Sequence, residues 1–126
     1  MAVSAEFSEH LRDLFGALGP FRIRRMFGGA GLFLDDAMFA LVADETIYMK
    51  TDDALAKAYA DAGSEPFTYS GNSRRIEMSY WRLPDSALDD ADEALEWARR
   101  SLVPAERAAA GKREAKTRKA ARKVKG

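Results

Sequence analysis

Arg24-Arg25-Met26-Phe27-Gly28-Gly29-Ala30-Gly31-Leu32-Phe33 is the stretch that decides the fold. Basic and apolar residues precede a pair of glycines, and apolar residues follow it. Because glycine adopts positive φ angles without a Cβ clash, Gly-Gly between two such runs is typical of a β-hairpin. A phosphate-binding loop would need a helix after the glycines, and the pattern here is that of a strand. The glycines that we assign to a structural hairpin are Gly28, Gly29 and Gly31.

An apolar period of two runs through residues 21–50 and predicts four strands. We place these strands at 21–27, 30–35, 38–43 and 46–50. The links at Asp35-Asp36 and Asp44-Glu45 are short, whereas a parallel crossover needs about a dozen residues or more. The sequence therefore predicts an antiparallel β-meander.

Helical periodicity predicts the elements around this meander. Ser4 can cap a first helix, and Thr51 or Asp52 can cap a second. Pro104 ends a third, because proline cannot continue a helix. We expect helices over 4–18, 52–62 and 85–103, with further strands at 67–70 and 75–83. The order α-β-β-β-β-α-β-β-α predicts an α+β fold, in which a two-layer, mainly antiparallel sheet has its helices on one face.

The strand Met38-Phe39-Ala40-Leu41-Val42 is apolar without alternation. A strand in an open sheet should show a polar outer face, so we infer that its second face is also covered. A second copy of the chain could cover it, which makes a homodimer through the sheet face one hypothesis. The alternative is a loop or the C-terminal helix lying across the sheet.

The charge of the chain is divided between its body and its C-terminal end. The 126 residues include 20 basic and 20 acidic ones. Residues 104–126 hold nine Lys/Arg and two acids, so this segment carries +7 and residues 1–103 carry −7. We predict a domain at 1–103 and a basic, disordered tail at 104–126. The tail residues that would contact nucleic acid are Lys112, Arg113, Lys116, Arg118, Lys119, Arg122, Lys123 and Lys125.

Several classes of chemistry lack the residues that they need. The chain has no cysteine, which excludes disulfides, thiolate metal sites and cysteine nucleophiles. His10 is the only histidine, and a catalytic histidine would need an orienting acid and a nucleophile. Asp35-Asp36 and the acids over 89–96 lack the spacing of a calcium loop. We therefore expect no metal, no cofactor, no catalytic residue and no enzymatic activity.

No apolar run reaches the roughly 20 residues of a membrane-spanning helix. The first residues show neither the basic nor the apolar region of a secretion signal. We therefore expect a cytoplasmic protein without a membrane partner.

One group of arginines precedes the glycine hairpin, and a second group stands at the start of the last predicted strand. If the strands of the two groups neighbour each other, the guanidinium groups form a patch for an anion or a partner, because the arginine fork matches phosphate and carboxylate. The alternative is pairing with the acids of the body on the solvent face. The residues concerned are Arg22, Arg24, Arg25, Arg74 and Arg75.

Aromatic residues near the last strand raise the question of base stacking. Tyr80 and Trp81 are adjacent, so they point to opposite faces of a strand. We expect one of them in the core and the other on the open face or in an interface, where Trp and Tyr are favoured. A stacking platform that also uses Tyr69 is the less favoured alternative.

The segment Arg25–Phe33 resembles the signature of the TfoX (Sxy) N-terminal domain family. Further blocks stand where that family has them, and the resemblance covers about residues 5–103. These blocks are Phe39-Ala40-Leu41-Val42, Ile47-Tyr48-Met49-Lys50, Pro66-Phe67-Thr68-Tyr69, Met78-Ser79-Tyr80-Trp81-Arg82-Leu83-Pro84 and Glu96-Trp97-Ala98.

The resemblance implies a function, because the founders of this family are non-enzymatic regulators of natural competence. They are thought to help a cyclic-AMP receptor protein act at promoters. The longer members carry a second, helical domain, whereas here a basic segment follows the body. The expectation is a regulatory or binding module that acts through protein contacts. The alternative is a nucleic-acid-binding accessory protein that uses its basic C-terminal arm.

Overall fold

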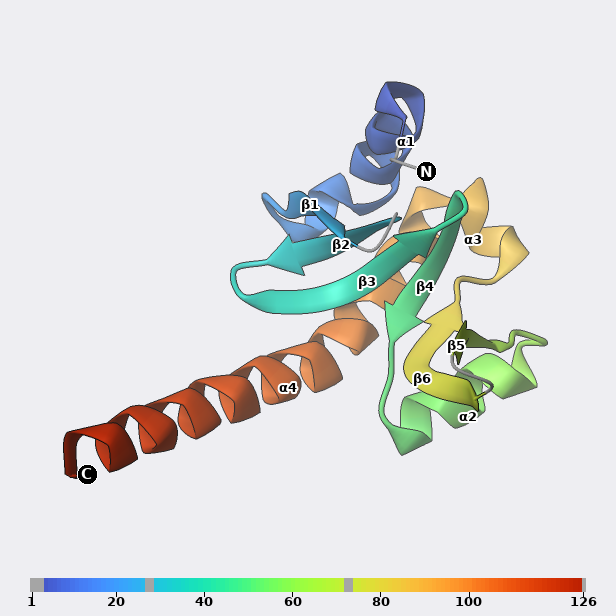
Figure 1. Ribbon diagram of the computed structural model, residues 1–126. Coiled ribbons are helices and arrows are strands. Elements are labelled where there is room, and N and C mark those ends of the chain that lie inside the picture. Colours follow the sequence, from blue (N-terminus) through green and yellow to red (C-terminus); the bar gives the residue numbers. More distant parts are fainter. Residues whose placement is uncertain (1–3, 27–28, 72–73, 126) are drawn as a thin grey trace.

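The computed structural model describes residues 4–26, 29–71 and 74–125, with the surroundings of their side chains except at 69–78 and 122–125. Its helices are α1 (Ala5–Phe15), the short 3₁₀ helix η1 (Gly16–Leu18), α2 (Asp53–Asp61), α3 (Asp85–Leu88) and α4 (Ala91–Lys125). Its strands are β1 (Arg22–Met26), β2 (Gly29–Leu34), β3 (Ala37–Ala43), β4 (Thr46–Lys50), β5 (Pro66–Gly71) and β6 (Arg74–Arg82). The predicted α+β fold is confirmed (Figure 1).

The six strands form one antiparallel sheet in the order β1-β2-β3-β4-β6-β5. The first four strands are the predicted meander. The β5–β6 hairpin joins it through β6, which pairs with β4. Asp35, Asp44 and Glu45 have φ angles of 56°, 50° and 57°, which places tight turns at the two predicted aspartate links. The first turn, with Gly28, lies outside the described residues, and Gly29 and Gly31 lie within β2.

Side-chain caps fix where the helices begin. The Ser4 hydroxyl accepts a hydrogen bond from the Phe7 amide at 3.1 Å, and Asp52 Oδ1 accepts one from the Leu55 amide at 2.9 Å. Ser4 is the predicted cap of the first helix, and Asp52 is one of the two residues predicted for the second. The third predicted helix is divided, because Asp90 begins a new one by accepting from the amides of residues 92 and 93. The acids at 89–90 therefore end α3 and start α4.

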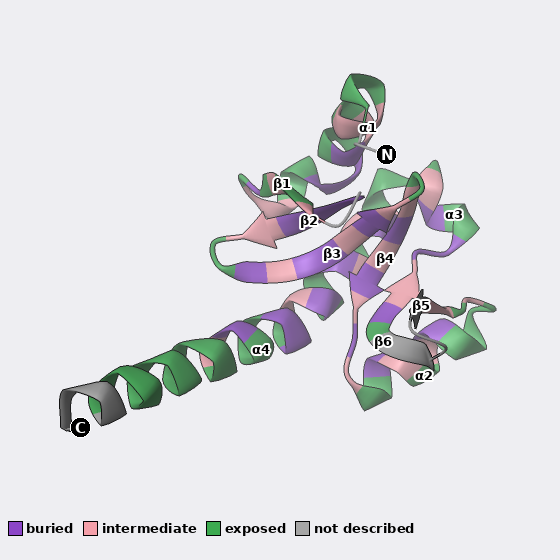
Figure 2. Cartoon of the chain, viewed as in Figure 1, coloured by how far each residue is buried: buried purple, intermediate pink, exposed green. Residues whose placement is uncertain are grey.

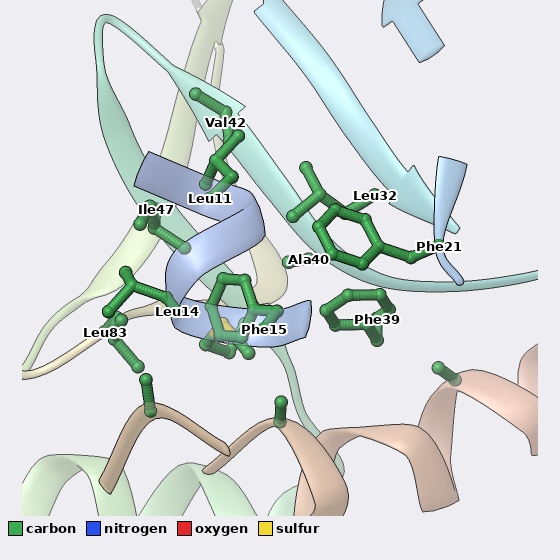
Figure 3. Packing of buried hydrophobic residues seen from close by; sticks show 14 of the residues in the cluster. Leu11, Leu14, Phe15, Phe21, Leu32, Phe39, Ala40, Val42, Ile47 and Leu83 are labelled. Carbon is green, nitrogen blue, oxygen red and sulfur yellow. The ribbon is translucent and has the colours of Figure 1, made fainter. Parts of the chain in front are cut away.

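Three phenylalanine rings form the centre of the core (Figure 3). The Phe39 ring lies 5.7 Å from that of Phe15 and 5.8 Å from that of Phe21, between centroids, and both pairs meet edge to face. The aliphatic residues labelled around them are Leu11, Leu14, Leu32, Ala40, Val42, Ile47 and Leu83. The apolar stripe of α1 therefore packs on the sheet, as its spacing predicts.

Small residues on α4 pack against the same core. Ala94, Ala98, Ser101, Ala105 and Ala109 are buried, and α4 contacts β3 and β4. Small side chains allow a helix to approach its neighbours closely. At 1.5 Å per residue, the 35 residues of α4 span about 52 Å. Its C-terminal part runs beyond the strands (Figure 1) and changes there from buried to exposed (Figure 2).

The prediction that Pro104 ends the third helix is wrong, because α4 continues through it. Proline inside a helix costs about 3 kcal/mol through a lost hydrogen bond and a clash. Pro104 is itself buried, and Ala105 and Ala109 beyond it join the core, so packing offsets this cost. Where the sequence predicts a disordered tail, the structure has helix as far as Lys125. The domain boundary at residue 103 stays a prediction.

A β-bulge accounts for the missing alternation in β3. Leu32 pairs with Ala40 and Phe33 pairs with Met38, which leaves Phe39 as an extra residue on β3. Phe39 and Ala40 are both fully buried in the core, whereas Met38 and Leu41 are half-buried. α4 packs on the core face of the sheet, so it is not the cover of the second face that the alternative named. The bulge accounts for the burial of both Phe39 and Ala40, whereas Met38 and Leu41 lie on the opposite face, and the homodimer stays a hypothesis.

Candidate functional site

One face of the sheet looks away from the core. Arg24 pairs with Gly31, Gly31 with Leu41, Leu41 with Tyr48, and Tyr48 with Arg82. Paired residues point to the same side of an antiparallel sheet, so these five form one row across it. The neighbouring pairs, such as Val42 with Ile47, belong to the core on the other side. We call the side of this row the outer face.

The outer face is mostly apolar and aromatic. Leu41 and Tyr48 are half-buried, and the Tyr48 ring lies 4.8 Å from that of Phe67. Burial and the nearby Glu65 raise the pKa of Tyr48. Phe33 and Met38 form a second pair on this face, and the guanidinium of Arg22 lies 5.7 Å from the Phe33 ring centroid. The outer face is thus an apolar strip with arginines at its borders.

The sheet order separates the two arginine groups that the sequence suggested as one anion patch. β1 and β6 have three strands between them, so the condition that their strands neighbour each other is not met. Arg22 and Arg24 lie on the outer face of β1, and Arg25 alternates to the other side. Arg22 donates to the Asp35 carbonyl at 3.2 Å. The side chains of Arg74 and Arg75 lie outside the described residues, so that site stays a prediction.

A positively charged corner forms where α4 passes the end of β4. Lys50 Nζ donates to Ser79 Oγ at 2.7 Å and lies 5.0 Å from the centroid of the Tyr80 ring. Burial, and then the charge of Lys112, lower the pKa of Lys50. Burial raises the pKa of Tyr80 to about 12, and its hydroxyl lies 3.5 Å from the Met38 carbonyl oxygen. Lys50 therefore brings a cation of the sheet next to the basic part of α4.

The basic part of α4 carries the residues predicted for nucleic-acid contact. Residues 111–121 are all exposed. This range holds Lys112, Lys116, Arg118 and Lys119. It also holds Arg113, which pairs with Asp36. The side chains at 122–125 lie outside the described residues. Sequence reasoning missed how these lysines are arranged, because it ended the helix at Pro104. The sequence contains the signal for this arrangement, because alanines and then lysines recur every three or four residues from Ala105 to Lys119, as they do on one side of an α-helix.

Other predicted positions have ordinary surroundings. Trp81 packs against the core, whereas Tyr80 is buried on the outer face, so the two side chains point to opposite sides as expected. Tyr69 lies outside the residues whose side chains are described. His10 is half-buried, with its ring centroid 6.0 Å from that of Phe7.

Two absences hold for the part of the chain that the structure describes. Over residues 4–26, 29–71 and 74–125, no three acidic or histidine side chains gather as they would around a metal ion. Within the same ranges, none of the helices combines the length and the apolar character needed to cross a bilayer.

Comparison with known proteins connects this architecture to a family. Residues 13–105 match the model of the TfoX N-terminal domain. The chain is 34% identical over 98 residues to the DNA transformation protein TfoX1 of Aliivibrio fischeri, covering 69% of this chain and 47% of that protein. It is 27% identical over 75 residues to Protein Sxy of Escherichia coli, covering 60% of this chain and 36% of that protein. It thus spans less than half the length of either relative. Because the family model covers most of the sequence, the chain belongs to the TfoX N-terminal domain family.

Proposed function

We propose that the chain is a non-enzymatic regulatory or binding module of the cytoplasm that acts through protein contacts on the outer face of its sheet. The observation that carries this proposal is the apolar strip of Leu41, Tyr48 and Phe67 on the side opposite the core. Aromatic residues, methionine and arginine are enriched in protein interfaces, and all three occur here. A protein partner would bury the strip and leave the arginines at its rim.

The relatives support a regulatory role. One of them is named a DNA transformation protein, and a role in competence is part of the proposal on that basis. A homodimer through the outer face is the version in which the protein partner is a second copy. In that arrangement the two strips would face each other across a twofold axis.

Leu41→Lys tests the outer face, with Val103→Lys as its matched control. Leu41 is half-buried on the outer face, whereas Val103 is 54% exposed on α4, and both substitutions replace an apolar residue by the same cation. The measurements are affinity capture of partners from the protein's own cells and sedimentation of the pure protein. We expect Leu41→Lys to lose the partner, or to convert a dimer to monomer, while Val103→Lys keeps it. Thermal melting shows that each variant is folded, and a folded Leu41→Lys that keeps every partner refutes the proposal.

Nucleic-acid binding by the exposed part of α4 is the second candidate function. It is favoured by the eleven consecutive exposed positions at 111–121, which hold five Lys/Arg and one acid. Removing residues 111–126 leaves Ala105 and Ala109 in the core, so the body should stay folded. Salt-sensitive DNA binding that survives this deletion would exclude the arm, and absence of binding by the full chain would exclude the function.

A further inference from the structure

One face of α4 changes its character along the helix. Over 94–109 this face packs on the sheet, and its buried residues recur every three or four positions as Ala94, Ala98, Ser101, Ala105 and Ala109. The same repeat continues beyond the sheet as Lys112, Lys116 and Lys119, which we call the lysine face. Residues at such intervals lie on one side of an α-helix. The lysine face is therefore the exposed continuation of the buried face, on the side of the helix toward the sheet.

Contacts with the body hold the lysine face in a defined orientation. Ala105 and Ala109 are buried just before it. Arg107 Nη1 lies 3.7 Å from Asp52 Oδ2, and Arg113 pairs with Asp36. Packing and ion pairs on both sides of residue 110 fix the rotation of the helix about its axis. The lysines thus project from a positioned helix.

The lysine face carries positive charge that no ion pair among the described residues neutralises. Among the described residues, Lys112, Lys116 and Lys119 form no ion pair with a carboxylate. Asp36 and Asp52, the acids of the body that form ion pairs with α4, are paired with Arg113 and Arg107. Lys50 extends the positive surface onto the sheet, and its lowered pKa reflects burial and then the charge of Lys112. The face is thus complementary to a polyanion.

We propose that the lysine face binds the phosphate backbone of duplex DNA without sequence preference. This inference rests on the second candidate function and specifies the residues that perform it. Lysine contacts phosphate as a point charge, which favours backbone contact over base reading. Position 123, the next lysine of the repeat, extends the face to about 17 Å along the helix. The family match ends at residue 105, so the lysine face lies outside it.

The structure favours duplex DNA over other nucleic acids. Residues 110–121 contain no aromatic side chain, so the face offers no platform for the unstacked bases of a single strand. The major groove of B-form DNA admits an α-helix, whereas that of A-form RNA is too narrow for protein groups to read. A straight, basic helix that projects from a body fits the first of these shapes.

The test compares two triple variants of the full chain. K112Q/K116Q/K119Q removes three charges from the lysine face, and R118Q/R122Q/K125Q removes three charges from the other sides of the same helix. The probe is a fluorescein-labelled 20-base-pair DNA duplex of mixed sequence, measured by fluorescence anisotropy between 50 and 300 mM NaCl. Circular dichroism checks that both variants keep their helix. If the lysines at 112, 116, 119 and 123 each contact one phosphate, the slope of log K against log salt is about −3.6 for the wild type.

We expect the lysine-face variant to bind at least tenfold more weakly, with a slope near −0.9, and the matched variant to keep the wild-type slope. Equal losses of DNA affinity in the two variants would show that all basic residues of the helix contribute alike. That result would overturn the proposal for the lysine face, while the second candidate function would stand. Absence of wild-type binding would overturn both. Tighter binding to single-stranded DNA, duplex RNA or polyglutamate of equal charge would overturn duplex DNA as the ligand.

Discussion

Arg113 in α4 forms an ion pair with Asp36 in the turn between β2 and β3, although the two residues lie 77 positions apart. The hydrogen bond from Arg113 is the main cause that lowers the pKa of the Asp36 carboxyl below its usual 3.8. A carboxyl whose pKa is lower in the folded state stabilises that state above its unfolded pKa. This contribution disappears as pH falls through the folded value, so the contact of α4 with the turn should weaken below about pH 4.

Arg113→Gln should therefore raise the pKa of Asp36 toward its ordinary value. The measurement is a carboxyl-carbon titration by NMR between pH 2 and 7. Arg118→Gln is the matched control, because it removes the same charge from an exposed position of the same helix. An Asp36 pKa that is already ordinary in the wild type would contradict the ion pair.

Truncation should locate the end of the folded unit. A chain ending at Ala110 keeps Ala105 and Ala109 in the core, and we expect its free energy of unfolding to stay within about 0.5 kcal/mol of the full chain. A chain ending at Val103 loses both alanines and the Arg107–Asp52 pair, and we expect a loss of about 1–3 kcal/mol. Urea unfolding measures the difference. Equal stability of the two truncations would instead support the sequence-based boundary at residue 103.

The two glycines of β2 should respond differently to alanine. A Cβ at Gly29 would overlap the backbone carbonyl oxygen of Val42, which cannot move without shifting β3. A Cβ at Gly31 would meet Met38 Sδ at 2.6 Å and Phe33 Cε1 at 2.9 Å, which are the ends of side chains that can turn away. We expect Gly29→Ala to cost about 1–3 kcal/mol in thermal or urea unfolding, and Gly31→Ala to cost less. A larger loss of stability for Gly31→Ala than for Gly29→Ala would show that the side chains of Met38 and Phe33 are held more rigidly than the backbone of β3.

We expect Tyr59 to contribute stability through its ring and not through its hydroxyl. The ring stacks on Trp97 with centroids 4.2 Å apart, and burial raises the pKa of the hydroxyl well above its usual range. Among the described residues, the buried hydroxyls of Tyr59 and Ser101 have no hydrogen bond of normal geometry. Tyr59→Phe should therefore leave the free energy of unfolding unchanged or raise it by up to about 1 kcal/mol.

Tyr59→Ala serves as the comparison, since it also removes the ring and should cost about 3–5 kcal/mol. Urea unfolding of both variants at neutral pH measures the difference. A loss above about 1.5 kcal/mol in Tyr59→Phe would mean that the two hydroxyls do bond to each other in solution.

Local patterns in the sequence predicted the strand positions and helix starts that depend on residues close together in the chain. The aspartate links and the period of two located β1 to β4, and the caps at Ser4 and Asp52 located two helix starts. These features follow from turn geometry and from hydrogen bonds within a few residues, so a short window of sequence contains them.

Features that depend on distant packing were not predictable in this way. The break between α3 and α4 follows from Asp90, which the sequence analysis placed inside a single helix over 85–103. The insertion of β6 next to β4 separates the arginine groups, and no local pattern determines that order. Pro104 stays helical because residues far away in the sequence bury its neighbours. The candidate surfaces were accordingly predicted in outline, as a sheet face and a basic segment, without the row at Leu41 or the alignment of the lysines.

The strand order has a further consequence for self-association. β1 and β5 are the edges of the sheet, where unpaired backbone groups invite other strands to add. β1 carries three arginines in five residues, and β5 begins with Pro66, which lacks an amide hydrogen. Charges and proline at sheet edges discourage amyloid-like stacking. The arginines of β1 and Pro66 of β5 therefore disfavour edge-to-edge pairing, so a homodimer of this protein is more compatible with contact through the outer face than through the sheet edges.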